Sequence, residues 1–444
     1  MYTEQLATIV PSAIEGSVAR ITGLTVAVAG FPAPVGALIE IDRQQGEPLD
    51  AEVIGFRDDL TLAYPFGELQ GVRRGNRARL MRTKGWLRVG PELLGRVIDA
   101  RGRTIDGQPE PVLAERTTLD RRPPSPVERP RIDTPLATGI RAIDGLLTCG
   151  KGQRMGIFAG SGVGKSVTLG MMSRYTSADV NVIALIGERG REVNEFIERD
   201  LGPEGLAKSV VVVATSDEPA LLRVRAAFVA TAVAEFFRDR GLDVLLVMDS
   251  LTRFALAQRE IGLAAGEPPT TRGFPPSVFA MLPRLVERAG RGPTGSITAF
   301  YSVLVEADDP QEPIGDAVRG LLDGHTWLSR KLASRGHYPA IDILGSLSRL
   351  MYDIAPAEQR EAATLVRELL GAHRDHEDLI SIGAYRRGSN RAVDLALETW
   401  EPIQQFLRQA VDERSTLEQT HEALLQLRRR AVERATSKPG ATTT

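Results

Sequence analysis

The chain has 444 residues, of which 25% are charged and 42% are apolar, and its formal net charge is −2. This length suits about two to four globular domains, and the near-balance of charge argues against a protein dominated by nucleic-acid binding, although it leaves room for a local basic groove. A single cysteine, Cys149, excludes an internal disulfide, so the fold needs no oxidising compartment. The N-terminal residues lack a signal-peptide pattern, and no stretch approaches the ~20 apolar residues of a membrane helix. A cytoplasmic protein is expected.

After a short N-terminal segment, 1–15, residues 16–107 are expected to form a β-barrel domain. Short alternating or β-branched runs separated by glycine and proline are typical of closely spaced strands. The aromatic residues of this region lie mostly next to turns, which favours packing over the base stacking of a nucleic-acid-binding barrel. The expected strands include 18–21, 24–29, 37–41, 52–56 and 78–81, and a further strand is expected within 93–99.

Residues 108–350 are expected to form an α/β core with a mostly parallel sheet, entered through a proline-rich linker at 108–135. Continuous apolar, β-branched runs are typical of strands buried on both faces, and helical patterns separate them. The expected strands are 180–187, 209–214, 243–249 and 296–305, and the helical segments include 193–199 and 218–240.

The β-branched runs stop near residue 351, so 351–435 is expected to form a C-terminal α-helical domain, followed by a flexible tail at 436–444. Pro356 suits a first helical position, and Gly371 suits the end of that helix. A second helix is expected at 391–409. Ser415 and Glu418 form a capping-box signature for a third helix, which is expected to run to about residue 434.

The stretch 154–168, RMGIFAGSGVGKSVT, places a glycine-rich loop between an apolar strand and a helix. Glycines let backbone N–H groups approach a phosphate, Lys165 can reach the β- and γ-phosphates, and Ser166 offers a hydroxyl to Mg²⁺. Ala159 stands where the strict Walker A pattern has glycine, but the Gly-Lys-Ser end carries most of the chemistry. A chance glycine-rich turn is the alternative, and the order of strand, loop and helix argues against it. The predicted nucleotide-binding residues are Gly160, Ser161, Gly162, Val163, Gly164, Lys165, Ser166 and Val167.

Two further acidic residues follow apolar strands, as a hydrolytic site requires. Asp249 ends the run 243–249 and fits a Walker B carboxylate that holds Mg²⁺, through water. Glu188 could polarise the attacking water, and Arg189 could pair with the γ-phosphate or with a neighbouring carboxylate. Alternatively, Asp249 caps a turn and the charged run 187–192 is a solvated face.

The order of these motifs resembles the hexameric rotary-type ATPases, relatives of the catalytic subunit of ATP synthase. Longer stretches narrow the resemblance to the export ATPases of the bacterial flagellum and of type III secretion injectisomes. The stretches that carry it are GERGREV (187–193), VMDSLTRFA (247–255), PAIDILGSLSR (339–349), LLGRVIDARGRTIDG (93–107), GEPPTTRGFPPSVFAMLPRLVERAG (266–290), GSITAFYSVLVEADDP (295–310), DAVRGLLDGHTWLSRKLASRGHYPAID (316–342) and IGAYRRGSN (382–390).

The resemblance assigns a role to each matching residue. It implies that Lys165 and Ser166 bind phosphate and Mg²⁺, that Glu188 is the catalytic carboxylate with Arg189 beside it, and that Asp249 is the Walker B acid. Arg349 matches the arginine finger that reaches the γ-phosphate of the next subunit, and Tyr338 matches an aromatic that stacks on adenine. From the residues alone, Arg349 would be a surface ion-pair residue and Tyr338 a core aromatic.

The resemblance also implies that residues 108–350 form a RecA-like P-loop ATPase domain. The implied function is that of a homohexameric Mg²⁺-dependent ATPase at the cytoplasmic face of the inner membrane, which energises protein export. Its implied partners are a stator or regulator at the N-terminus, a stalk protein in the ring, export chaperones and substrates, and export-gate membrane proteins, without nucleic acid. The motifs favour the flagellar apparatus, and an injectisome is the alternative. An RNA-dependent motor like the terminator Rho, or a non-catalytic nucleotide-binding subunit, fits less well, because the charge is balanced and Lys165, Glu188 and Asp249 are all present.

Overall fold

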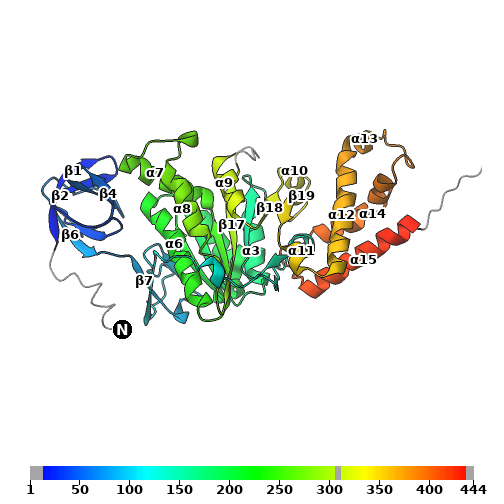
Figure 1. The fold of residues 1–444 in the computed structure, drawn as a ribbon, viewed down its shortest axis with the longest axis horizontal. Coiled ribbons are helices and arrows are strands. Elements are labelled where there is room, and N and C mark those ends of the chain that lie inside the picture. Colours follow the sequence, from blue (N-terminus) through cyan, green and yellow to red (C-terminus); the bar gives the residue numbers. More distant parts are fainter. Residues whose placement is uncertain (1–13, 306–311, 437–444) are drawn as a thin grey trace, which may run out of the picture.

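The computed structural model describes residues 14–305 and 312–436. An N-terminal barrel, a central sheet covered by helices, and a group of C-terminal helices follow one another along the long axis of the molecule (Figure 1). Residues 1–13, which hold most of the expected N-terminal segment, and residues 437–444 of the expected tail lie outside the described part. In the described part, no helix is long and apolar enough to cross a lipid bilayer.

The N-terminal barrel is closed by six antiparallel strands in the order β1-β2-β5-β4-β3-β6. Valine, isoleucine and alanine side chains fill its interior, among them Val26, Ile39 and Val53. Strand β5 was not among the predicted strands. Its last five residues are all buried, because Ala63 packs inside the barrel whereas Tyr64 packs against the central domain. Such a strand lacks the polar–apolar alternation that identifies its neighbours. The strands are β1 (Glu15–Thr22), β2 (Thr25–Ala29), β3 (Leu38–Ile41), β4 (Leu49–Arg57), β5 (Leu60–Pro65) and β6 (Arg77–Arg82).

The expected boundary after residue 107 is too late, because the barrel strands end at Arg82. Strand β8 (Val97–Asp99), assigned from the sequence to the barrel domain, pairs in parallel with a strand of the central sheet. The proline-rich linker also contains structure: β9 (Glu115–Thr118) pairs with β7 (Trp86–Val89). Strands of three or four residues that pair with distant partners leave a weak periodic signal in the sequence, which explains both differences.

The central sheet has the strand order β19-β18-β12-β17-β15-β13-β14-β8, and all neighbours are parallel except the pair β18–β19. The strands predicted at 209–214 and 243–249 are confirmed to the residue, and those at 180–187 and 296–305 to within one residue. The core strands are β12 (Arg154–Ala159), β13 (Val180–Ile186), β14 (Ser209–Ala214), β15 (Asp243–Asp249), β17 (Ser296–Leu304), β18 (Gly324–Leu328) and β19 (Ile341–Ser348), and a short β16 (Gly290–Arg291) pairs with β17.

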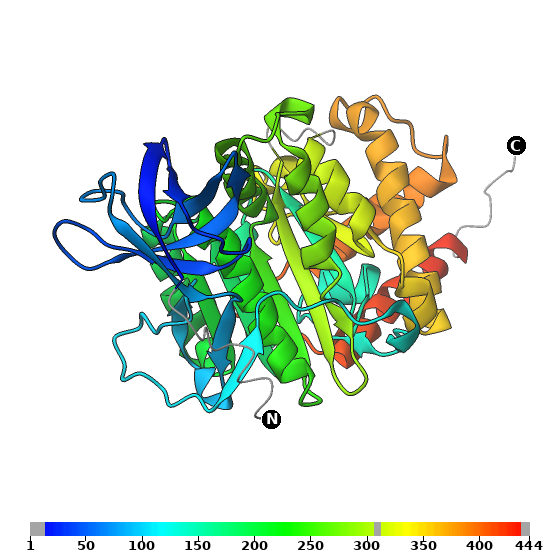
Figure 2. The ribbon, with the colours of Figure 1, turned by 60° about the vertical axis from the view of Figure 1, so that its left-hand side comes forward.

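Helices cover both faces of this sheet, as the alternating pattern predicts. Apolar side chains of α6, α7, α8 and α9 form one core, whereas those of α2, α3 and the C-terminal helices form the other. Figure 2 shows the blue barrel beside the green helices of the central part. The helices of the central part are α2 (Arg141–Leu146), α3 (Lys165–Tyr175), α4 (Gly190–Glu195), a π-helical turn η3 (Phe196–Leu201), α5 (Gly202–Ala207), α6 (Ala220–Arg238), α7 (Leu251–Ala265), α8 (Pro276–Val286), α9 (Pro313–Leu321), α10 (Arg330–Ala333) and α11 (Met351–Ile354).

A fully buried ion pair ties the linker to the central domain. Arg288 donates two hydrogen bonds to the Glu235 carboxylate, at 2.9 and 2.7 Å, and a third to the Leu119 carbonyl oxygen at 2.7 Å. Arg288→Met leaves a buried, uncompensated carboxylate, and we expect it to lower the free energy of unfolding by about 3–5 kcal/mol. Urea unfolding of the purified protein measures the loss. The double variant Arg288→Met/Glu235→Leu should regain much of it, and a single variant as stable as wild type would contradict this account.

The C-terminal domain consists of α12 (Ala357–Asp375), α13 (Glu377–Ser381), α14 (Arg391–Leu407) and α15 (Leu417–Thr436). Gly371 does not end the first helix as expected: α12 continues for another turn because its apolar face is packed, and a helical glycine costs only about 1 kcal/mol. The capping box of α15 is also shifted by one residue. Thr416 Oγ1 accepts from the Gln419 N–H at 3.2 Å, and Gln419 Oε1 accepts from the Thr416 N–H at 3.0 Å, whereas Ser415 bonds to Thr420.

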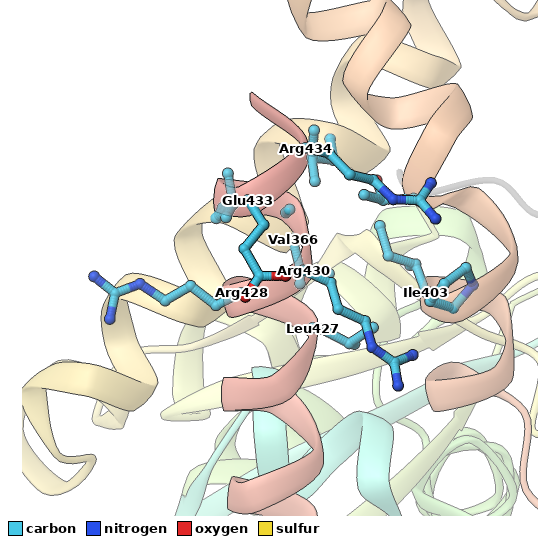
Figure 3. Close-up of a pocket in the computed structure, with 12 residues that line it drawn as sticks. Val366, Ile403, Leu427, Arg428, Arg430, Glu433 and Arg434 are labelled. Carbon is cyan, nitrogen blue, oxygen red and sulfur yellow. The ribbon is translucent and has the colours of Figure 1, made fainter. Parts of the chain in front are cut away.

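A cavity of about 310 Å³ lies among α12, α14 and α15. Its floor includes Val366, Ile403 and Leu427, and the side chains of Arg428, Arg430 and Arg434 spread around its mouth (Figure 3). None of the predicted nucleotide-binding or catalytic residues lines it. This cavity is therefore separate from the predicted site.

Candidate functional site

The glycine-rich loop joins the buried strand β12 to α3, in the order that the sequence predicts. Two of its glycines, Gly162 and Gly164, have φ values of +77° and +89°, which only glycine adopts without strain. Lys165 and Ser166 follow in the first turn of α3, where free N–H groups and the helix dipole attract anions. Ser166 is exposed and Val163 is buried. The local geometry is therefore that of an anion cradle.

Lys165 meets both predicted carboxylates at the end of this loop. Asp249 is the last residue of β15 and Glu188 follows β13, and these two strands are paired neighbours, so both side chains emerge at the same edge of the sheet. The Lys165 ammonium forms an ion pair with Asp249 and lies 3.7 Å from Glu188 Oε1. All three side chains are at least four-fifths buried. The structure thus brings together three residues that are far apart in the sequence.

Glu188 has an unusual protonation equilibrium for a glutamate. Burial, together with the negative charge of Asp249, raises the pKa of Glu188 to about 7, against the opposing charge of Lys165. A carboxylate whose pKa lies near the working pH is an effective proton acceptor. Glu188 therefore has the chemistry of a general base.

Three polar residues that sequence reasoning missed complete this cluster. Ser302 donates to Asp249 Oδ1 at 2.6 Å, while Glu192 raises the pKa of Glu188 and the charge of Arg253 lowers it. Ser302 could have been noticed in the sequence, because it is a serine within an otherwise apolar stretch near the C-terminal end of β17, which pairs with β15. Arg253 lies in α7, one turn after Asp249.

Tyr338 lies beside the loop, although it is distant in sequence. A methyl group at Gly164 would lie 3.4 Å from two ring atoms of Tyr338, which is van der Waals contact. The tyrosine side chain is 46% exposed, so it is not the core aromatic that the residues alone suggest. An exposed ring next to a phosphate cradle is placed to stack on a base.

Both predicted arginines are exposed, unlike the largely buried side chains of Lys165, Glu188 and Asp249. Arg189 is largely exposed and pairs with Glu192 at 3.4 Å. Arg349 follows β19, which runs antiparallel to β18, so it lies at the edge where the parallel strands begin. The glycine-rich loop at 160–164, called the P-loop from here on, follows the other end of these strands, about 13 Å away along β12 at ~3.3 Å per residue. Arg349 is exposed and does not reach the P-loop of its own chain.

Ser166 and Asp249 offer a hydroxyl and a carboxylate, the oxygen ligands that Mg²⁺ prefers. Within residues 14–305 and 312–436, no group of three His, Cys, Asp or Glu side chains could hold a metal ion. Mg²⁺ in nucleotide sites takes one or two protein ligands and completes its shell with phosphate oxygens and water. The donor set therefore fits Mg²⁺ bound together with a nucleotide.

Comparisons with known proteins agree with this geometry. The ATP synthase alpha/beta family, nucleotide-binding domain, matches residues 139–348, and the T3SS EscN ATPase C-terminal domain matches residues 355–426. The flagellum-specific ATP synthase of Bacillus subtilis is 51% identical over 93% of this chain and 94% of its own. The type 3 secretion system ATPase of Xanthomonas euvesicatoria is 52% identical over 95% of each chain.

A solved structure agrees over most of the chain. The assembled ATPase EscN from the type III secretion system of enteropathogenic E. coli superposes with a TM-score of 0.88 at 47% identity, and covers 93% of this chain and 99% of that one. The expected architecture of barrel, nucleotide-binding core and C-terminal helices is confirmed. The chain therefore belongs to the ATP synthase alpha/beta family and is an ATPase of its flagellar and type III secretion branch.

Proposed function

We propose that the chain hydrolyses Mg²⁺-ATP as a homohexamer whose sites lie between subunits, and that this reaction energises protein export. The proposal rests on the fact that Arg349 and the buried cluster lie at opposite edges of the sheet within one chain. Lys165, Glu188 and Asp249 form a buried cluster at one edge of the sheet, whereas Arg349 is exposed at the opposite edge. A site completed by the arginine of a neighbouring copy would join the two edges.

Each residue near the P-loop has a proposed task. The amide groups at 160–167 and the Lys165 ammonium bind the phosphates, and Tyr338 stacks on the adenine. Ser166 and Asp249 would hold Mg²⁺, Asp249 through water, and would thereby place positive charge beside the phosphates. Glu188 orients the attacking water and accepts its proton. Arg189, at the N-terminus of α4, is proposed to pair with the γ-phosphate or with a carboxylate of the site.

Arg349 is proposed as the arginine finger of the next subunit. A guanidinium beside the γ-phosphate neutralises charge that develops in the transition state, and its planar fork suits phosphate oxygens. Arg349 is exposed and lies at the edge of the sheet opposite the P-loop, which supports a contact with the nucleotide site of a neighbouring subunit.

The proposed partners follow the same branch of the family. A structure of EscN with its central stalk EscO supports a stalk protein in the ring as a partner for this chain. A stator or regulator at residues 1–15, export chaperones with their substrates, and export-gate membrane proteins are proposed from the resemblance. They would hold the ATPase at the cytoplasmic face of the inner membrane.

The apparatus that the ATPase serves is proposed to be the flagellum, with an injectisome as the alternative. The flagellar relative from Bacillus and the type III secretion relative from Xanthomonas are 51% and 52% identical to this chain, so sequence identity does not distinguish a flagellum from an injectisome. Deletion of the gene decides: loss of flagellar filaments supports the flagellar assignment, and intact motility with lost effector secretion contradicts it.

Phosphate release and assembly of the purified chain test the proposal. We expect Mg²⁺-dependent ATP hydrolysis that is lost in Lys165→Ala, and a sixfold mass by light scattering when a non-hydrolysable ATP analogue is present. RNA should not stimulate the reaction, in contrast to a Rho-like motor. Full-speed hydrolysis by a species that stays monomeric at every concentration would refute the proposal.

A further inference from the structure

The Tyr338 ring, which is proposed to stack on the adenine, is called the Tyr338 platform below. The backbone of Tyr338 is hydrogen-bonded to the C-terminal domain. Its carbonyl oxygen accepts a hydrogen bond from the Gln409 N–H at 3.0 Å. Gln409 follows α14 of the C-terminal domain, whereas Tyr338 belongs to the segment between α10 and β19 of the core. The position of the ring beside Gly164 therefore depends on the chain segment that leaves α14.

The Gln409 side chain fixes that segment to the core. Gln409 is 5% exposed, and its Oε1 accepts from the Arg141 N–H at 2.8 Å. Its Nε2 donates to the carbonyl oxygens of Gly139 and Glu413, each at 2.7 Å. A buried amide with three good hydrogen bonds is a rigid connection, because each broken bond would leave a polar group unpaired.

The helix α3, which carries Lys165, is also hydrogen-bonded to the segment 408–415 that follows α14. At the C-terminal end of α3, Arg174 and Tyr175 both donate to the Val411 carbonyl oxygen, at 2.7 and 3.1 Å. On the other side, the buried His337 ring is hydrogen-bonded to Gln404 of α14 at 3.0 Å. The segment 408–415 thus joins the P-loop helix, the Tyr338 platform and the C-terminal helices.

We propose that Gln409 is a positioning residue of the nucleotide site. It sets the gap between Tyr338 and the P-loop, so that a displacement of α14 changes the affinity for the nucleotide base. Phosphate binding is spared, because the contacts of α3 with the segment are at Arg174 and Tyr175, at the opposite end of the helix from Lys165. The C-terminal helices and the base thereby share a coupling free energy, which acts in both directions. This inference rests on the proposed binding of ATP phosphates at the P-loop.

Binding of two ligands, one with a base and one without, distinguishes an effect on the base from an effect on the phosphates. Titration calorimetry would compare Mg²⁺ with the β,γ-imido analogue of ATP and Mg²⁺ with inorganic tripolyphosphate. In Gln409→Ala, we expect about 3- to 10-fold weaker binding of the ATP analogue, from the loss of side-chain hydrogen bonds, and binding of tripolyphosphate within about twofold of wild type. The KM for ATP should rise with little change in kcat. Gln405→Ala, an exposed glutamine on α14, is the matched control and should change neither ligand.

A double-mutant cycle with Tyr338→Ala tests whether Gln409 acts through the ring. In the Tyr338→Ala background, Gln409→Ala should weaken the ATP analogue no further, because coupled residues are not additive. Additive losses, or equal losses of both ligands in Gln409→Ala, would overturn the inference. If Gln409→Ala fails to fold, Gln409→Glu, which keeps the acceptor for Arg141 and loses the donor, should show a smaller loss with the ATP analogue alone. Failure of tripolyphosphate to bind the wild-type chain would instead refute the proposed function.

Discussion

Arg349→Ala is expected to bind ATP with nearly wild-type affinity and to lose about 10³- to 10⁵-fold in kcat. The side chain lies too far from the P-loop of its own chain to contribute to binding there. If it serves the neighbouring site, its removal leaves transition-state charge without compensation. Steady-state hydrolysis, combined with equilibrium binding of the imido analogue, measures the two quantities separately.

Mixing variants tests whether Arg349 acts in trans. Arg349→Ala mixed with Lys165→Ala should regain part of the activity, because some interfaces then combine an intact P-loop with an intact arginine. Arg349→Lys retains the charge but not the planar fork, and should remain strongly impaired. Unchanged turnover of purified Arg349→Ala would remove the finger assignment.

Glu188→Gln is expected to bind ATP and to lose about 10²- to 10⁴-fold in kcat, the usual contribution of a general base. Burial raises the pKa of Glu188 to about 7, so in the wild type the base is ionised above that pH and protonated below it. The kcat/KM of the wild type should therefore fall as the pH drops through about 7, whereas that of Glu188→Gln should be flat in this range.

A matched control for Glu188→Gln is Glu195→Gln, which changes a half-exposed glutamate that pairs with Arg191 in the same helical region. Its pH profile and turnover should match those of the wild type. Near-normal turnover of Glu188→Gln, or an acid limb that persists in it, would count against the catalytic role.

The raised pKa of Glu188 also affects stability, with a definite sign. Because the pKa in the folded chain lies above the ordinary glutamate value, the folded state binds the proton more tightly than the unfolded state does. This contribution to stability is present below about pH 4.5 and is lost as the pH rises through about 7. Glu188→Gln should remove this component of the pH dependence of unfolding.

Strong local patterns were sufficient to predict the nucleotide-binding core. The buried strands β14 and β15 are continuous apolar runs with clear ends, and the P-loop has its own glycine signature. Residues whose structure depends on distant partners were predicted less well. Strand β8 needs β14 to define it, and the continuation of α12 past Gly371 depends on packing rather than on propensity.

The candidate site shows the same division. Lys165 was identified from the glycine-rich loop pattern, and Asp249 and Glu188 were identified because one ends and the other follows an apolar strand. Ser302 lies inside a strand, and its role depends on the register of β17 against β15. Arg349 and Tyr338 had no local signal, and only the resemblance to the export ATPases assigned them a role.

The antiparallel strand β19 has a consequence for assembly. It gives the chain two unlike ends of one sheet, a receptor edge with the P-loop and a donor edge with Arg349. If the donor of one copy enters the receptor of the next, the contact joins two different surfaces, and such head-to-tail contacts either close into a ring or continue as a filament. Catalytic competence would then belong to the junction between copies, and the terminal copies of an open chain would contribute one idle half-site each.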